Sequence, residues 1–438
     1  MWVSARSTEC HYSCGHTEGV AVPLKRHRLC ERRKALGYSQ ERLAEVLGVE
    51  RSTVVRWEGA ETDPQPWHRT RIAEVLQVTL DQLDDMLCDV TTPIRRGQTM
   101  GDDSRHSSSA AVRAELLSGL RTFLTDYLPE SQPERPARTL TEVRREVTRT
   151  HALYHRASYS SAARLLPELL RHATELTNKG SWPQRSSAFR LLAAGYLAAS
   201  KVAVKIGDGD TALLAADRAA TAARVADDLG LASIAAYQAA CALLRLPGRL
   251  DEAERVTQAS IEQLAQKRPT TDLNLLSAHG ALLLLAAVIA AKQGQTPAAN
   301  ARLTEGQSLA AELRTDQNRL WTGFGPTNVV IHSVSAAVKA GNGGRAIEIG
   351  AKLDTSRLPS ALVGRRAQVH LDLAAATAMA SDGGSLAVLH LLEAERVAPE
   401  SVRVNVQARA LLLDLMSRER RSATPGLRPL AERAGLLT

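Results

Sequence analysis

Aromatic residues are scarce in this chain. Trp, Tyr and Phe together make up 3% of the residues, whereas 44% are hydrophobic and Ala and Leu dominate. Because strands prefer aromatic and β-branched side chains, this composition favours tightly packed helices over a β-sandwich. We therefore expect an all-α protein, and 438 residues are enough for more than one domain.

The sequence also lacks a long apolar run and a cysteine framework. Its longest apolar stretch, 281–291, is shorter than the roughly 20 residues that cross a hydrocarbon core. The first residues do not combine a basic start with an apolar run, as a secretory signal would. Five cysteines in so long a chain indicate reduced thiols. We expect a cytoplasmic protein without membrane contact.

No catalytic motif is present. The chain has no GxxxxGK[ST] phosphate loop, no HExxH zinc motif and no GxSxG nucleophile elbow. His151 and His155 lie one helical turn apart and could share a metal, but two such ligands without a third are more often solvated. We expect no catalytic residue, no metal and no cofactor, which favours a binding protein over an enzyme.

The N-terminal segment, 1–22, has no hydrophobic period and contains Cys10, His11, Cys14 and His16. These four soft ligands leave two interpretations open. Zinc could bind them, but compact structural zinc sites usually pair CxxC-like halves across an ordered turn. A disordered segment is the interpretation that we favour.

Three further segments follow from the apolar pattern. Residues 23–88 predict a domain of five short helices, 89–138 a linker with one helix from about 111 to 127, and 139–438 a second domain. The first part of the linker, 89–109, is polar and rich in Gly, Ser, Arg and Asp. Its end is interrupted by Pro129, Pro133 and Pro136.

Positive charge is concentrated near the start of the first domain. The chain carries a net charge of +8, and residues 24–60 contain nine Lys or Arg against five Glu. Six of the nine fall in one predicted helix, namely Lys25, Arg26, Arg28, Arg32, Arg33 and Lys34. This cluster predicts positive potential where a phosphate backbone could lie.

The most informative stretch is YSQERLAEVLGVERSTVVRWEGA, which begins at Tyr38. Ser39 is a typical N-cap for a helix that Gly48 ends, and a second helix begins near Arg51. We expect Val54, Val55 and Trp57 to form the buried side of that second helix. Two short helices joined by a tight turn allow the second to enter a major groove.

This stretch resembles the λ-repressor-like, or XRE, class of helix-turn-helix domains, and the resemblance covers 24 to about 87. The pattern SQxxLAxxLGVxxSTVxRWE and the later VTLDQL carry it. The resemblance implies that Gln40 contacts a phosphate, while Arg51, Ser52 and Arg56 face the groove. It implies double-stranded DNA as the partner and transcriptional regulation as the function.

Side-chain chemistry agrees with these roles. Arginine can bond bidentately to guanine, so Arg51 and Arg56 favour an operator with G·C pairs. Ser52 and Thr53 stay open between base reading and phosphate contact or packing. A surface ion pair with a neighbouring Glu is the alternative for Arg56. Because one short helix reads few base pairs, we expect a homodimer on two half-sites.

The second domain contains internal repeats. Six segments pair a loop-like Gly, Asp or Ser with an Ala-rich helix, and their sixth position is always alanine. These alanines are Ala162, Ala212, Ala253, Ala299, Ala346 and Ala387. A small residue at a fixed point lets two helices approach closely, which predicts stacked helix pairs. The alternative is an Ala-rich bundle without true repeats.

The repeats resemble tetratricopeptide repeats through these alanines and through Pro399, the counterpart of that family's closing proline. Successive alanines lie 41 to 50 residues apart, whereas that repeat has about 34, so longer helices or loops are expected. Stacked hairpins of this kind form a superhelix with a concave groove. Related bacterial architectures bind signalling peptides there, which implies an effector.

The register of the alanines predicts which side chains line that groove, and the set consists of two basic residues, two amides and one imidazole. They are Lys201, Gln238, Arg245, Asn328 and His332. Their amides suit a peptide backbone and their cations suit a carboxylate. Ordinary solvated side chains on a dimerising surface are the alternative.

The motif LWTGFGPTN from 320 places Trp321 and Phe324 beside two glycines and a proline. A rigid turn with core-filling aromatics and a ligand-facing corner both fit it. For the whole chain we predict a DNA-binding transcriptional regulator that responds to a small molecule or peptide. The alternative is a scaffold that uses its repeats for protein contacts and does not depend on DNA.

Overall fold

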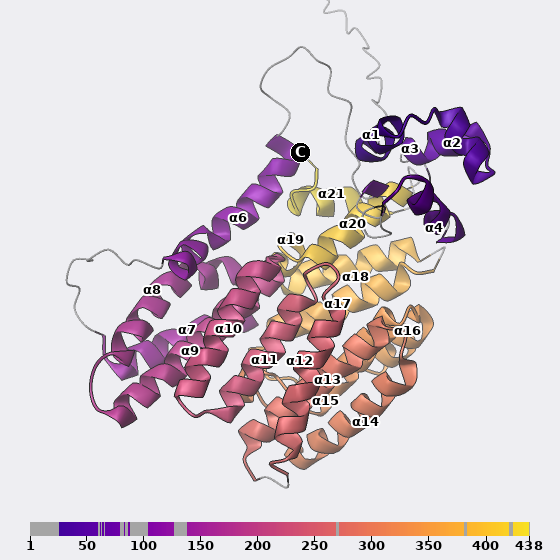
Figure 1. Cartoon of the computed structure of the whole chain (residues 1–438). Coiled ribbons are helices and arrows are strands. Elements are labelled where there is room, and N and C mark those ends of the chain that lie inside the picture. The colour runs from indigo at the N-terminus through magenta and orange to yellow at the C-terminus, as the bar shows by residue number, and fades with distance from the viewer. Residues whose placement is uncertain are drawn as a thin grey trace, which may run out of the picture. The chain divides into compact units, whose positions relative to one another are not determined.

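The computed structural model describes residues 26–59, most of 62–87, and 104–126, 138–268, 271–380, 383–419 and 424–437. No strand occurs within these ranges, and the all-α prediction is confirmed. The chain divides into two compact units, Met1–Gly101 and Asp102–Thr438 (Figure 1). The possible zinc ligands between 10 and 16, and Lys25, lie outside the described residues.

The first unit is a small helical domain. Its described helices are α1 (His27–Ala35), α2 (Gln40–Leu47), α3 (Arg51–Glu58) and α4 (Pro66–Val75). Its core is formed by buried side chains from all four helices and from the segment that follows them, including Leu29, Leu43, Val54, Trp57, Ile72 and Leu83. This core fixes α3 against α2.

Local signals produce the α2–α3 turn as the sequence predicts. The Ser39 hydroxyl accepts a hydrogen bond of 3.0 Å from the backbone amide of Arg42, which caps α2. Gly48 ends α2 in the left-handed region, with φ +69°, where a side chain would be strained. α3 then begins at Arg51, with Glu50 as its N-cap residue.

The second unit consists of antiparallel helix pairs. The first five are α7 (Leu140–His155) with α8 (Tyr159–Thr177), α9 (Trp182–Ile206) with α10 (Gly209–Val225), α11 (Leu229–Leu243) with α12 (Leu250–Ala265), α13 (Leu273–Lys292) with α14 (Thr296–Leu313), and α15 (Pro326–Lys339) with α16 (Gly343–Ala351). The sixth is α17 (Val363–Thr377) with α18 (Gly384–Val397). The short helix α19 (Pro399–Arg403) and the helices α20 (Val406–Arg418) and α21 (Leu427–Arg433) follow.

The six predicted alanines share one structural position. Each is the fourth residue of the second helix of its pair, and each is at most 3% exposed. Alanine at this point lets the second helix lie close against the first, as the repeat pattern predicts. Pro399 is the first residue of α19, a position that suits its fixed φ and missing amide hydrogen.

The first helices of the pairs form a closed ring. Along the chain α7, α9, α11, α13, α15 and α17 contact one another in turn, and α17 also contacts α7. Two hydrogen bonds join the same region: the hydroxyls of Tyr159 and Ser401 lie 3.3 Å apart, and the Ser160 amide donates to Glu400 at 2.9 Å. We call these contacts between α7–α8 and α17–α19 the seam.

The helix α6 (Ser104–Thr125) belongs to the second unit. It packs on α8, α9 and α10 through the fully buried Leu117, Leu120 and Leu124. Arg121 also pairs with Asp208 at 2.6 Å. The sequence prediction put the start of this helix near 111 and assigned it to the linker. The prediction starts this helix too late because residues 104–110 are mostly polar, so no apolar period marks its first turns.

Two helices of the second unit, α9 and α13, are long and apolar enough to cross a membrane by length and composition alone. In this protein 78% and 72% of their most apolar segments are buried inside the helical unit. The sequence prediction counted only the uninterrupted run at 281–291 and so missed this length. Their burial is that of core helices packed on both sides.

Candidate DNA interface and candidate ligand cavity

The exposed face of α3 consists of Arg51, Ser52, Val55 and Arg56. These positions follow one another at helical spacing, while Val54 and Trp57 on the opposite face are at most 5% exposed. The prediction that Val55 is buried is therefore wrong, since 37% of this residue is exposed. Val55 adds an apolar side chain to a face that is otherwise polar.

Two carboxylates lie at the start of this face. Arg51 pairs with Glu41 of α2 through Nε and Oε1 at 2.5 Å, and both side chains are more than half exposed. The Ser52 hydroxyl donates to Glu50 at 3.1 Å. Exposed ion pairs of this kind are weak, so Arg51 can exchange Glu41 for a guanine or a phosphate at little cost.

Arg56 lies one turn along the same face. Its Nε donates to the Ser52 carbonyl at 3.4 Å, a long hydrogen bond that leaves the rest of the guanidinium facing outward. The sequence left open a surface ion pair between Arg56 and a neighbouring Glu. Among the described residues, it is Arg51 that forms such a pair, with Glu41. Thr53 is half-buried, and its backbone amide donates to the Glu50 carbonyl.

Gln40, the first residue of α2, is held by a buried ion pair. Its amide nitrogen donates to Glu58 Oε2 at 2.7 Å. Glu58 in turn binds Arg33 at 2.5 Å, and these two side chains are 6% and 7% exposed. The hydrogen bond and charge of Glu58 raise the pKa of the Arg33 guanidinium. This Arg33–Glu58–Gln40 network fixes the Gln40 side chain at the start of α2.

The basic cluster near α1 is used largely for folding. Arg26 is buried and donates to the carbonyls of Leu87 and Trp57 at 2.7 and 2.9 Å. Arg32 donates to Leu76 and Gln77, and Arg33 pairs with Glu58. These three arginines join helices within the domain, so their guanidiniums are committed to the fold and are not available to contact a phosphate backbone. Sequence counts charge but does not reveal which guanidiniums bind carbonyls.

The ring of the second unit encloses a cavity of about 190 Å³. Its wall is formed by α7, α9, α11, α13, α17 and the short 3-10 helix η1 (Arg319–Trp321). Of the five ligand-binding residues predicted from sequence, Lys201, Gln238 and Arg245 line this cavity. Asn328 and His332 do not. They are 1% and 8% exposed within α15, and His332 Nδ1 lies 2.9 Å from the Asn328 carbonyl.

The sequence prediction missed several polar residues of the wall, among them two cations and an amide: Lys205, Arg365 and Gln368. Lys205 lies one turn after Lys201 in α9, a helix whose residues are otherwise almost all apolar or small between 191 and 206. Two lysines on one side of such a helix are a signal that sequence alone contains. Arg365 and Gln368 come from α17, and only ring closure brings them to this place.

The two aromatic residues of the motif at 320 lie in different surroundings. Phe324 is fully buried, and it occupies the space that a Cβ at Gly280 would need. Trp321 instead lines the cavity and stacks on His151, with ring centroids 3.8 Å apart. Leu320 and Trp321 both have positive φ, +46° and +56°. Such strain in non-glycine residues concentrates at ligand-binding sites.

His151 and His155 are neither solvated nor part of a metal cluster among the described residues. His151 is 1% exposed, and its Nε2 lies 3.0 Å from the Ala194 carbonyl. Burial lowers the pKa of His151 well below its usual value and lowers the pKa of His155 to about 3. The sequence suggested solvation because it cannot show that the ring buries this helix face.

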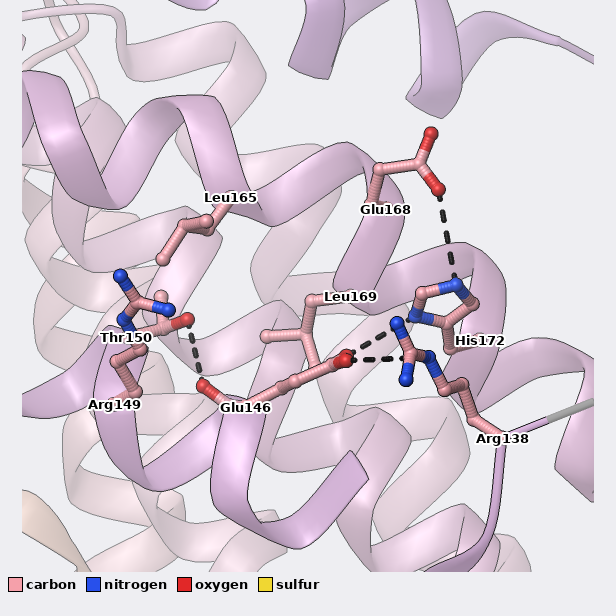
Figure 2. Close-up of a pocket in the computed structure, with 8 residues that line it drawn as sticks. All are labelled: Arg138, Glu146, Arg149, Thr150, Leu165, Glu168, Leu169 and His172. Atoms are coloured by element: carbon pink, nitrogen blue, oxygen red, sulfur yellow. Dashed lines mark hydrogen bonds and ion pairs between the residues drawn. The ribbon is translucent and has the colours of Figure 1, made fainter. Parts of the chain in front are cut away.

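A larger hollow of about 380 Å³ lies between α7 and α8 (Figure 2). Its two arginines, Arg138 and Arg149, balance its two glutamates, Glu146 and Glu168, in charge. His172 Nδ1 lies 3.1 Å from Glu146 and its Nε2 3.8 Å from Glu168, while Arg138 approaches Glu146 at 3.9 Å (Figure 2). A hollow with compensated charges has no excess charge with which to select a ligand. The central cavity is therefore the better candidate.

Comparison with known proteins identifies one part of the chain. Residues 31–83 match the helix-turn-helix family, and the match is to the XRE-type domain. The matched range runs through α2, α3 and α4 and includes the exposed face of α3. None of the curated proteins matches the chain.

Proposed function

We propose that this protein is a sequence-specific transcriptional regulator that acts in the cytoplasm, in which α3 reads operator DNA and the ring unit controls it. The observation that supports this most directly is the exposed face of α3 within a helix-turn-helix domain. That face combines two arginines, a hydroxyl and an apolar side chain. These are the groups that distinguish bases in a major groove.

The proposed roles follow from the geometry of each side chain. Arg56 binds guanine O6 and N7, and Val55, its neighbour in α3, contacts a thymine methyl group. Arg51 reads a second base after it leaves Glu41. Gln40, positioned by Glu58, donates its second amide hydrogen to a phosphate. Ser52 and Thr53 contact the backbone beside it.

Arg56→Ala is expected to weaken operator binding by about 1–3 kcal/mol and to relax the preference at one base pair. Arg51→Ala should fall at the lower end of that range, because Arg51 gives up its pair with Glu41 on binding. Gln40→Ala should weaken operator and random DNA alike, since phosphates carry no sequence information. The measurement is affinity at several salt concentrations for an operator found by genome-wide mapping.

Arg42→Ala is the matched control, because Arg42 is an equally exposed arginine of α2 that pairs with Glu45. It should leave the base preference unchanged. Equal losses on operator and random DNA for Arg56→Ala would contradict base reading. Binding that ignores sequence in the unmodified protein would support the scaffold function instead.

We further propose a homodimer on paired half-sites about 10 base pairs apart, so that the two copies of α3 enter successive major grooves. One α3 exposes four side chains, which is too few to single out one genomic site. Light scattering on the operator complex measures the number of chains bound.

We also propose that the central cavity binds an effector that changes DNA affinity. An effector can do so only if it binds the DNA-competent and incompetent states differently. Protein purified from its host is expected to release a bound small molecule on denaturation, and adding that molecule back should shift operator affinity several-fold. Identical operator affinity with and without every released compound would contradict effector control.

A further inference from the structure

The central cavity has an unusual balance of charge. Four cationic side chains line it: Lys201, Lys205, Arg245 and Arg365. No Asp or Glu is found among the described residues of its wall. The other polar groups there are uncharged, because burial keeps the phenols and the Cys241 thiol protonated and His155 neutral, with the pKa of Cys241 raised to about 11.

The protein groups that contact these cations are dipoles and not charges. The Lys201 ammonium donates to the Trp321 carbonyl at 2.9 Å, and Lys205 donates to Gln368 at 3.1 Å. Arg365 donates to the Thr322 carbonyl at 3.3 Å. Arg245 Nε is buried without a hydrogen-bond partner among the described residues. These contacts orient the cations toward one space but leave their charge uncompensated.

One carboxylate lies just behind the residues that line the cavity. Asp372 of α17 accepts from Gln368 at 3.0 Å and from the Ser335 hydroxyl. It is 8% exposed, and burial raises its pKa. Even as an anion it supplies one negative charge against four positive ones. The excess is therefore at least three positive charges when all four side chains are protonated.

This excess disfavours the charged forms of the lysines. Burial and the nearby Arg365 lower the pKa of Lys201 to about 7, and burial and Arg245 lower the pKa of Lys205 to about 8. Lys205, Arg245 and Arg365 keep partial accessible surface because they border the cavity itself. Groups that are costly in the free protein are typical of sites whose stabilising partner is a ligand.

We infer that the central cavity binds a compact organic anion that carries two negative charges and a planar body, such as a small aromatic phosphate ester or dicarboxylate. This inference rests on the proposed effector site and names its ligand class. Arg245 and Arg365 offer planar forks that match phosphate or carboxylate oxygens. Tyr154, Tyr237 and Trp321 supply flat surfaces for the body.

The size of the cavity favours a small ligand. Its 190 Å³, counted as the space open to the centres of water molecules, is room for a group of waters or a small organic molecule. A small metabolite fits this space, whereas an extended peptide of several residues does not. The cavity thus favours the small-molecule effector over the peptide that the resemblance of the repeats implied.

The experiment uses the full-length protein without DNA and phenyl phosphate as the probe. Calorimetry is expected to show one site per chain for phenyl phosphate and for phthalate. Benzyl alcohol and benzylamine, which are similar in size but neutral and cationic, should not bind. Inorganic phosphate, compared with chloride at equal ionic strength, should raise the melting temperature of the second unit.

Arg245→Met is the decisive variant. It should weaken phenyl phosphate binding at least about tenfold, while the ligand-free protein melts at the same or a higher temperature, because a buried guanidinium without an anionic partner is removed. A merely structural arginine would lower the melting temperature. Arg357→Met is the matched control, since that side chain of the 3-10 helix η2 (Thr355–Arg357) is 78% exposed.

A second variant keeps the test decisive if Arg245→Met fails to fold. Lys205→Met should reduce the same affinity at least about tenfold, with Lys352→Met, 77% exposed in its ion pair, as its control. Equal binding of benzyl alcohol and phenyl phosphate, or unchanged affinity in both cavity variants, would overturn the inference. Because no DNA is present, this failure is distinguishable from a failure of operator binding.

Discussion

Arg33→Met is expected to destabilise the first unit by about 3 kcal/mol and to remove most operator binding, although Arg33 lies in none of the proposed base contacts. The change breaks a buried ion pair and leaves Glu58 charged and unpaired. Breaking such pairs costs about 3–5 kcal/mol, and the lower end applies to a domain so small that water lies one side-chain layer away. Hydrogen exchange of peptides from the first unit measures the loss.

Two further variants separate stability from positioning. Arg42→Met breaks an exposed pair with Glu45. It should change the unfolding free energy of the first unit, as measured by hydrogen exchange, by less than about 1 kcal/mol. The double variant Arg33→Met with Glu58→Leu removes both buried charges and should recover most of the stability. It also removes the acceptor that holds Gln40, so non-specific affinity should stay reduced. Unchanged exchange in Arg33→Met would contradict the network.

Acidification from pH 7.5 to 5.5 is expected to cost the second unit about 4 kcal/mol of unfolding free energy. Burial lowers the pKa of His155 and of His332 to about 3, and it lowers the pKa of His151 well below its usual value of 6.5. These imidazoles stay neutral in the folded state and take up protons on unfolding. Below pH 6.5 the unfolded chain therefore binds more protons, so stability falls as pH falls, by about 1.4 kcal/mol for each histidine.

Urea unfolding of the second unit at several pH values measures this dependence. His151→Gln should remove about one third of it, because glutamine can still donate to the Ala194 carbonyl but does not titrate. His172→Gln is the matched control, because this imidazole lies at the outer hollow and its replacement leaves the three imidazoles buried in the ring unchanged. A midpoint independent of pH over this range would contradict the burial of the three histidines.

The buried lysines extend the same trend to higher pH. Their pKa values of about 7 for Lys201 and about 8 for Lys205 lie below the ordinary 10.5. Between these values and pH 10.5 the unfolded chain again binds more protons, so stability should continue to rise with pH. A bound anion opposes this, because it stabilises the ammonium forms.

The parts of the fold that sequence predicts well are those determined within a few residues. Ser39 and Gly48 mark the ends of α2 because capping depends on local backbone geometry. The alanine register placed six helix pairs because the close approach of two neighbouring helices demands a small residue at one fixed position. Both signals lie within one hairpin.

The errors arise where distant residues meet. Arg26 and Arg33 resemble Lys34 in sequence, and only the fold shows that the first two bind carbonyls and a carboxylate. Val55 has the apolar character of a core residue, yet the angle at which α3 meets the core exposes it. Asn328 and His332 occupy the right helix for the groove, but the ring turns them inward into protein.

The seam changes how the second unit can come apart. In an open array of repeats each hairpin packs only on its neighbours. The terminal hairpins can therefore unfold independently, and unfolding proceeds from the ends. Here the first and last hairpins hold each other, so neither is an end in that sense. If the interface between two neighbouring pairs is lost, either the other interfaces are strained or the seam breaks. The six pairs should therefore unfold together, as one cooperative unit. A molecule bound in the central cavity would contact the first helices of five of the six pairs directly, so a change at any of these helices could reach it without a relay of intermediate steps.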